Sequence, residues 1–509
     1  MTVLRLLLWL CVVLVLWEGA LRLVPGSLLV SSPLAIAGYV SNNAALLARA
    51  ALETSVNAAQ GFVWGNLAAI GLGTIMIVFP RSARTLSAVC LLVFCVPLIA
   101  SGPILRVLFG PGTGPQIALA ALAVYYTTLL TLLVGLRAVS QTWTDLMRVY
   151  GRGPMSTLIR ARARASLPYL FVGLQISAPA ALLGAMIGEF TGAERGLGVL
   201  TLRAMRGLDT NATWALALIA ALIAMIAYGS IGWLGQRVVA YRPVILLSAP
   251  AVSVRQRPWK YLLEIGFTTA FVLILWQVSM DALDLNRFFA KRPGDVWAFL
   301  AEAQNRNTVL SALAETLSFA VPGYLAGLAL GAALAALVVL SPALNRATMP
   351  VAVALRAVPI ITTAPLLVLA FGRGLVGTMV VVAVMIFFPT FVACQQGLRQ
   401  TPGQVVDLFR SYDAGRWHLL RAAQIPAMLP AFFASARMAV PAALLAITTV
   451  EWLATGKGIG VLMATTASTS NYNMLWSCVV ILAVVAVVVY AAVAAVEHRV
   501  LRIYANEQV

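Results

Sequence analysis

Long apolar runs, separated by short polar stretches, dominate the pattern of this chain of 509 residues. Many of these runs exceed about 18 residues, which is the length of a helix that crosses a lipid bilayer. Lipid offers no partner to an unpaired backbone amide, so the runs must be helical where they cross it. The pattern therefore predicts an all-α integral membrane protein with about 12 transmembrane helices.

The apolar runs divide evenly between the two halves of the chain, with six in each. In the first half we expect spans at roughly 3–24, 58–80, 85–106, 115–136, 169–189 and 212–234. In the second half we expect them at roughly 262–280, 319–340, 349–370, 375–397, 431–452 and 473–496. We interpret the first run as a span and not as a cleaved signal peptide, because no clear small-x-small cleavage site follows it.

The same landmarks occur twice in one register. Glu189 precedes a Gly-Leu-Gly stretch, and Glu451, 262 positions later, precedes Gly-Ile-Gly. The same offset relates Trp214 to Trp476, without a gap between the two pairs. A repeat of this length indicates duplication.

The duplication predicts two similar units that lie parallel to each other. An even number of spans gives both copies the same orientation, so an axis along the membrane normal relates them in a parallel pseudo-twofold arrangement. We expect a first repeat at residues 1–240, a cytoplasmic linker at 241–260 and a second repeat at 261–509.

Arginine is concentrated in particular loops. The chain carries a net charge of +18, although only 10% of its residues are charged. The positive-inside rule places both termini, and the loops between the fourth and fifth spans, in the cytoplasm. This accounts for the basic balance without nucleic acid. The five Cys and two His are too scattered for a metal site, and we predict no metal, cofactor or catalytic residue.

Two of the cytoplasmic loops are unusually polar and share one pattern. They read "DLMRVYGRGPMSTLIRARARASLP" at 145–168 and "DLFRSYDAGRWHLLRAAQIPAMLP" at 407–430. Gly151 gives the first loop its turn, and Asp413 occupies the same position in the second. We expect Asp413 to cap the helix that follows it.

Each loop ends at a proline and carries a short helix outside the bilayer. Pro168 and Pro430 suit the first turn of the next span, where no amide donor is needed. Trp417, among basic residues, is typical of a docking element. The first loop has an Arg-Ala repeat in place of an apolar stretch, and we expect it to couple more weakly.

With these motifs the sequence resembles the permease subunits of ATP-binding-cassette importers, two of them fused in one chain. Those permeases carry a cytoplasmic loop of the form E-A-A-x-x-x-G followed by a hydrophobic-x-x-Pro region. The segments "VVDLFRSYDAG…QIPAMLP" and "TWTDLMRVYGRG…ASLP" are similar to it. The subgroup for nitrate, alkylsulfonates, taurine and pyrimidine precursors is the most similar, on "LRAVPIITTAPLLVLAFGRG", "FFPTFVACQQGLR" and "VEWLATGKGIGVLM".

The resemblance implies a type I importer permease of the inner membrane. Two copies of a cytoplasmic ATPase would dock on the two loops, and an extracytoplasmic solute-binding protein would deliver a small solute. The chain has no G-x-x-x-x-G-K-[ST] motif and so is no ATPase itself. The coupling residues implied are Asp145, Tyr150, Gly151, Gly153 and Pro168 in the first loop, and Asp407, Tyr412, Asp413, Trp417 and Pro430 in the second.

Four charged residues near membrane depth are candidates for the translocation pathway. Glu189 and Glu451 end the fifth spans, where we read them as supports of the outer segment, with direct gating as an alternative. Arg106 and Arg356 lie in or beside the third spans and would face an anion, or else reach to the interface. Pro97 is expected to bend the third span of the first half.

The solute and the energy source have alternatives. The resemblance suggests an anion such as nitrate, sulfonate or taurine, or a pyrimidine precursor, while fused ferric iron or thiamine permeases have a similar layout. A twelve-helix secondary transporter is the other class. It would place titratable groups inside several spans for ion coupling, and few are present.

Overall fold

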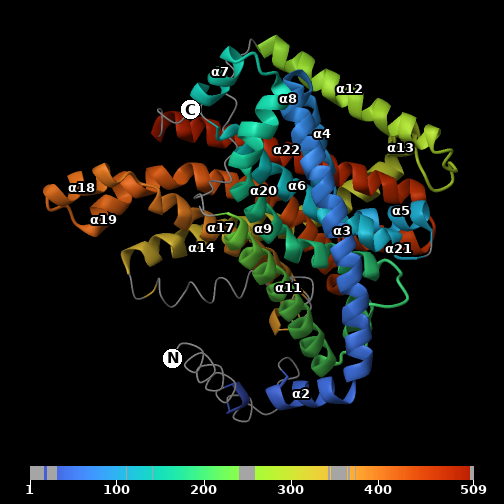
Figure 1. Ribbon diagram of the computed structural model, residues 1–509. Coiled ribbons are helices and arrows are strands. Elements are labelled where there is room, and N and C mark those ends of the chain that lie inside the picture. Colours follow the sequence, from blue (N-terminus) through green and yellow to red (C-terminus); the bar gives the residue numbers. More distant parts are fainter. Residues whose placement is uncertain are drawn as a thin grey trace.

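Every regular element in the described part of the chain is a helix (Figure 1). The computed structural model describes residues 17–19, 31–110, 112–139, 141–239, 258–341, 344, 364, 367, 368, 370–372 and 374–504. No strand occurs among these residues.

The helices follow one order in each half. The first half contains α2 (Pro33–Asn42), α3 (Ala44–Val78), α4 (Pro80–Cys95), α5 (Leu98–Phe109), α6 (Gly114–Arg137), α7 (Gln141–Val149), α8 (Pro154–Thr157), the π-helical turn η1 (Leu158–Arg162), α9 (Ala163–Phe190), α10 (Leu197–Arg206) and α11 (Thr210–Val238). The second contains α12 (Pro258–Ala282), α13 (Pro293–Ala301), α14 (Ala303–Leu340), α17 (Leu375–Arg399), α18 (Gly403–Ser411), α19 (Arg416–Leu419), η2 (Leu420–Gln424), α20 (Ile425–Val450), η3 (Glu451–Thr455), α21 (Ile459–Ser468) and α22 (Tyr472–Tyr504).

Eight of the expected spans are helices long and apolar enough to cross a membrane. They contain α3, α6, α9, α11, α14, α17, α20 and α22. The expected span at 262–280 falls in α12, whose apolar part is shorter than the other eight. Most of the span expected at 3–24, of the span expected at 349–370 and of the linker at 241–260 lies outside the described residues.

The third span of the first half is not one continuous helix. We expected it at 85–106, but α4 and α5 meet there at an angle of 95°. Pro97 stands at the junction in an extended conformation, because a proline lacks the amide that would continue the ladder and its ring clashes with the preceding turn. The bend expected at Pro97 is therefore confirmed, and it is sharp enough to divide the span in two.

The duplication read from the sequence is repeated in the helix boundaries. The pairs α7 and α18, α8 and α19, η1 and η2, and α10 and α21 begin and end at positions separated by the same offset as Glu189 and Glu451. The two halves therefore share one backbone plan through the loop and into the helices that follow.

Small residues bring the membrane helices of each half together at equivalent points. A Cβ at Gly65 of α3 would lie 2.6 Å from Ala121 O of α6. In the second half a Cβ at Gly327 of α14 would lie 2.8 Å from Ala383 O of α17. Such contacts let backbones approach closely, which favours helix association in lipid. They hold α3 on α6, and α14 on α17, as the scaffold for α9 and α20.

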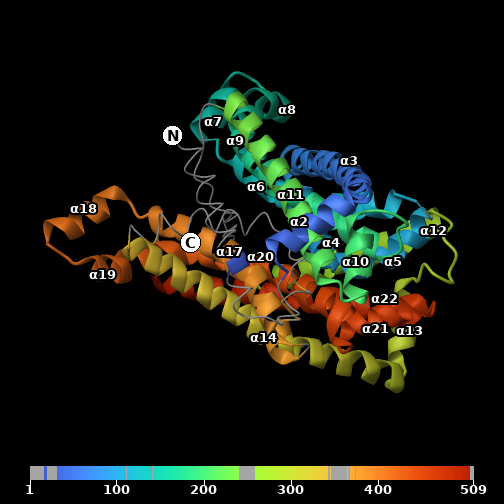
Figure 2. The same ribbon diagram turned by 90° about the horizontal axis from the view of Figure 1, so that it is seen from below.

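The two halves share their apolar cores. Cys95 and Ala100 of the bent α4–α5 pair are buried in a cluster with second-half residues such as Met463. In return, Leu445 and Trp452 pack against the core of the first half. The view from below shows α20, α21 and α22 beside α4 and α5 (Figure 2), so the halves form one membrane body.

Candidate coupling loops and translocation pathway

The first polar loop folds as a short helical hairpin. Gly151 follows α7 in a left-handed conformation with a φ of 65°. Its N–H donates to Arg148 O (2.9 Å), and the Arg152 N–H donates to Met147 O (2.9 Å). These bonds close the C-terminus of α7. Glycine suits this position because it lacks the Cβ that makes a positive φ costly.

The second loop uses the same turn with a different residue. Asp413 has a φ of 52°, and its N–H donates to Arg410 O (3.0 Å). The helix that follows, α19, starts after Gly415 and has no side-chain cap. Our prediction that Asp413 caps the following helix is wrong: it ends α18, because Asp tolerates the left-handed conformation better than most residues.

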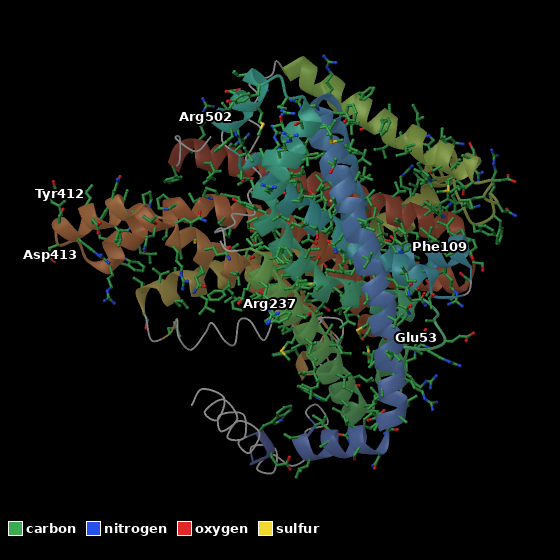
Figure 3. All side chains as sticks on the ribbon, viewed as in Figure 1. Glu53, Phe109, Arg237, Tyr412, Asp413 and Arg502 are labelled. Atoms are coloured by element: carbon green, nitrogen blue, oxygen red, sulfur yellow. The ribbon has the colours of Figure 1, made fainter. Side chains whose placement is uncertain are left out.

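Aromatic side chains stand at the tips of both hairpins. The α18–α19 hairpin projects from the body of the molecule, with Tyr412 and Asp413 at its tip (Figure 3). Tyr412 is 80% exposed and Trp417 64%, and Tyr150 in the first hairpin is 73% exposed. Large aromatic groups in water are available to a partner surface.

The two acidic residues of the loops pair locally. Asp145 lies 3.2 Å from Arg148, and Asp407 lies 3.6 Å from Arg410, each three residues further along the same helix. All four side chains are well exposed, so these pairs contribute little to stability.

The spans that follow the loops begin earlier than we predicted. α9 begins at Ala163 and α20 at Ile425, so Pro168 and Pro430 lie inside these helices and not in their first turns. The π-helical turns η1 and η2 connect α8 to α9 and α19 to α20. The short helices α8 and α19 therefore continue directly into the membrane helices α9 and α20. Gly153 begins the first of these continuous segments, since its carbonyl accepts the Thr157 N–H (3.1 Å).

Glu189 is buried at the end of α9 and holds the start of α10. Its Oε2 accepts the Gly198 N–H (2.6 Å), and its Oε1 accepts the Thr54 hydroxyl (2.7 Å). The Thr54 hydroxyl in turn accepts the Leu197 N–H (2.8 Å). Gly196 has a φ of 127°, and a Cβ there would lie 2.2 Å from the carboxyl carbon of Glu189. A carboxylate favours a helix N-terminus, whose first amides lack partners.

Glu451 occupies the equivalent place with fewer contacts. Its Oε2 accepts the Gly460 N–H (2.8 Å), and Thr316 accepts the Ile459 N–H (2.9 Å). The Thr316 hydroxyl is close to the carboxylate but donates to Ala312 O, and Glu451 Oε1 accepts no hydrogen bond within the described residues. The two carboxylates share a position and differ in how firmly each is held.

Arg106 lies at the C-terminal end of α9. Its guanidinium donates to Thr191 O (3.3 Å) and lies against Gly192, which has a φ of 120°. A cation beside a helix C-terminus is favoured by the unpaired carbonyls there. The other arginine candidate, Arg356, lies outside the described residues.

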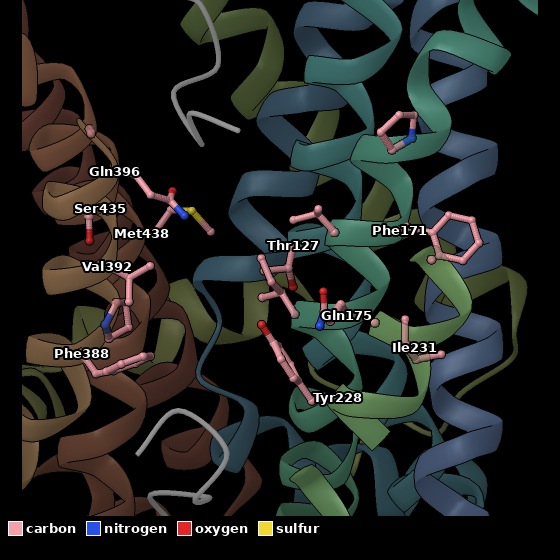
Figure 4. Close-up of a pocket in the computed structure, with 18 of the residues that line it drawn as sticks. Thr127, Phe171, Gln175, Tyr228, Ile231, Phe388, Val392, Gln396, Ser435 and Met438 are labelled. Atoms are coloured by element: carbon pink, nitrogen blue, oxygen red, sulfur yellow. The ribbon is translucent and has the colours of Figure 1, made fainter. Parts of the chain in front are cut away.

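A cavity of about 680 Å³ lies between the two halves. Membrane helices α6, α9 and α11 form one wall, and α17 and α20 form the other (Figure 4). Thr127, Gln175 and Tyr228 extend from the first wall, and Gln396 and Met438 face them from the second (Figure 4). Its size and mixed lining are typical of a small-molecule site.

The sequence of this chain matches a known family of membrane proteins. One family model, described as "Binding-protein-dependent transport system inner membrane component", matches residues 61–240 and again residues 327–502, together well over half of the chain. The chain belongs to this family. It is a tandem of two such permease domains, each with one hairpin and one buried glutamate, and it is a multi-pass inner membrane protein of the ABC transporter class.

Curated permeases are similar to parts of the chain. A probable ABC transporter permease protein of Haemophilus influenzae is 32% identical over 35% of this chain and 72% of its own length. The formylaminopyrimidine transport permease ThiX of Halalkalibacterium halodurans is 32% identical over 29% of this chain and 59% of its own length. The riboflavin transport system permease RibX of Chloroflexus aurantiacus is 25% identical over 51% of this chain and 97% of its own length. About half of this chain thus matches nearly the whole riboflavin permease.

Sequence reasoning assigned none of the cavity-lining residues to the pathway of this permease; Pro168 lines the cavity, but it was named for its loop. The three candidates that the structure describes, Arg106, Glu189 and Glu451, do not line it. The available signal was Gln175, an amide in the middle of an apolar span, since a polar residue at membrane depth is a functional candidate. The other residues that line the cavity come from helices far apart in the sequence, and no local sequence pattern distinguishes them.

Proposed function

We propose that this permease forms the whole translocation pathway of an ABC importer, driven by a separate cytoplasmic ATPase. The observation that carries the proposal is the pair of hairpins with the same helix boundaries, each exposing aromatic groups outside the membrane helices. Two copies of the ATPase would bind the loops 145–168 and 407–430. Because each hairpin continues into α9 or α20, a movement of the ATPase would be transmitted directly to a membrane helix.

The hairpins and both chain termini would face the cytoplasm. Arginine is frequent in both loops, and short loops rich in Lys and Arg stay on the cytoplasmic side. An extracytoplasmic solute-binding protein would then meet the opposite face, where Glu189 and Glu451 would support the start of α10 and α21. Relatives carry formylaminopyrimidine and riboflavin, and we propose a small solute of comparable size.

Association with the ATPase provides the test. The tagged chain would be purified from its host in mild detergent, and co-purifying ATPase would be quantified by mass spectrometry. We expect about two ATPase copies per wild-type chain. A variant with Tyr412→Ser and Trp417→Ser should lose at least half of them.

The control variant is Trp297→Ser. Trp297 in α13 is an aromatic residue outside the hairpins and is 79% exposed. It should retain both ATPase copies. A chain that is folded but carries no ATPase in any form would contradict the proposal and favour an ion-driven transporter.

A further inference from the structure

The duplication gives the cavity a counterpart in the other half, and that counterpart is closed. Arg437 of α20 and Glu497 of α22 form a largely buried ion pair at 2.9 Å. Beside it, Tyr490 of α22 is hydrogen-bonded to Tyr126 of α6, which belongs to the first half. The Arg437 guanidinium also lies 5.9 Å from the ring of Tyr490. These contacts join α20 to α22 and α22 to the other half.

The same four positions in the cavity carry side chains that cannot make these contacts. With the repeat offset, Arg437 corresponds to Gln175 and Glu497 to Gly235. Tyr490 corresponds to Tyr228, and Tyr126 corresponds to Phe388, which has no hydroxyl group. The cavity is lined by all four of the equivalent residues, Gln175, Gly235, Tyr228 and Phe388.

The cavity therefore lies where the repeat lacks the ion pair between α20 and α22 and the hydrogen bond between the halves that occupy its counterpart. Gly235 has no side chain at the position equivalent to Glu497, and Phe171 of α9 packs against it, so that an added Cβ would lie 3.2 Å from Phe171 Cδ1. The amide of Gln175 instead lies against α11, where a Cβ at Gly232 would be 2.3 Å from its Nε2. One groove is filled by its own side chains, while the other is open.

The lining of the open groove is nearly free of charge. Among the residues that line it, Arg399 is the single charged one, and it lies near the end of α17. The polar groups are mostly amides and hydroxyls, such as those of Gln175, Gln396 and Tyr228. Phe171 and Phe388 supply aromatic rings.

We propose that this cavity binds one molecule of an uncharged, planar solute with amide-like edges, such as a nitrogen heterocycle, and that the counterpart groove binds none. The proposal rests on the proposed function as a permease. A buried site without carboxylates disfavours a cation, because nothing there offsets the loss of its hydration. A single arginine offsets little of the desolvation cost of a buried anion. Glutamine amides both donate and accept and so match a heterocycle edge. Aromatic rings stack on its face.

Direct binding to the purified full-length chain with its ATPase tests the proposal. The probes are riboflavin, a formylaminopyrimidine and uracil as uncharged heterocycles, and ethanesulfonate as the anion, each measured by equilibrium dialysis. We expect at least one heterocycle to bind at one molecule per chain and ethanesulfonate to bind on the order of 10-fold more weakly or not at all.

Three variants and a control locate the site. Gln175→Leu should weaken heterocycle binding on the order of 10-fold, as should Tyr228→Phe if its hydroxyl contacts the solute. The variant with Gln175→Arg and Gly235→Glu should lose binding, because it rebuilds the pair that fills the other groove. The control, with Arg437→Gln and Glu497→Gln, changes the filled groove and should bind as wild type does.

Three results would overturn the inference: tighter binding of ethanesulfonate than of every heterocycle, no heterocycle binding to folded wild-type chain, or unchanged binding in both Gln175 variants. The ATPase content of the same preparations is read separately. Solute binding without an associated ATPase would refute the proposed function and leave the site in place. An associated ATPase without heterocycle binding would support the proposed function and refute the proposed solute site.

Discussion

The two grooves between the halves of this permease occupy equivalent positions of the repeat, but one is filled by side chains and the other is open. In the groove next to α22, Arg437, Glu497 and Tyr490 fill the space with an ion pair and a hydrogen bond to Tyr126. In the groove next to α11, a cavity remains. The side chains at equivalent positions of the repeat differ, and this difference separates the filled groove from the open one.

The two hairpins show a smaller difference of the same kind. Their helix boundaries correspond residue for residue, yet one turn uses Gly151 and the other Asp413. The first hairpin also exposes Val149 and Tyr150, so exposure gives no support to our expectation that it couples more weakly. Where a partner recognises backbone shape and an aromatic tip, side chains elsewhere in the loop are free to diverge.

The largest expected effect separates the filled groove from the open one. Arg437→Leu should lower the free energy of unfolding by about 3–5 kcal/mol, because it leaves Glu497 buried without a partner. Gln175→Leu at the equivalent position should change it by only about 0.5 kcal/mol. Adding Glu497→Gln to Arg437→Leu should recover most of the loss, and the comparison fails if it recovers none.

Unfolding can be followed with a thiol-reactive fluorogenic dye. Cys90, Cys95, Cys394 and Cys478 are all buried free thiols, so they react with the dye only when the protein opens. The measurement uses a Cys11→Ser background in detergent, with the melting temperature as the readout.

The next effect compares the hairpins through their tyrosines. Tyr150→Ser and Tyr412→Ser should each weaken ATPase binding by about 2 kcal/mol, the range of an interface hot spot. Titration of the purified ATPase against the chain in nanodiscs measures this loss. If Tyr412→Ser alone had an effect, the hairpins would not be equivalent docking sites, and the weaker coupling expected of the first loop would stand.

A smaller difference is expected between the two glutamate sites. Thr54→Val removes the bond from Leu197 N and the bond to Glu189, and should cost about 1–3 kcal/mol. Thr316→Val removes the bond from Ile459 N and the bond to Ala312 O but none that holds the carboxylate, so its cost should be about half as large. The dye-based melting temperatures of the two variants test this order, and equal losses would show that Glu451 is held as firmly as Glu189.

The smallest effect concerns the left-handed turn. Asp413→Gly should stabilise the second hairpin by up to about 1 kcal/mol, and Gly151→Asp should destabilise the first by a similar amount. Limited proteolysis within each hairpin reports local opening, since cleavage follows the population of the open form. Slower cleavage of the Gly151→Asp variant would show that this turn is not limited by its φ.

Much of the fold followed from the sequence because each signal was contained within one helix or one register. The length of the apolar runs predicted the eight spans confirmed here, since lipid requires helices of that length. The offset between Glu189 and Glu451 predicted the duplication, and the polar loops were found from their position between spans. The buried glutamates were identified because an acid at the end of an apolar run is uncommon.

The tertiary structure decided what depends on contacts between helices. The 95° bend at Pro97 depends on where α5 packs against the second half, and the sequence predicted only that some bend occurs. The pairing of Arg437 with Glu497, and the cavity at Gln175, require helices that are distant in the chain to cross at particular points. A hydrophobic pattern shows which residues can enter a membrane, but which side chains meet there depends on how closely the helices pack.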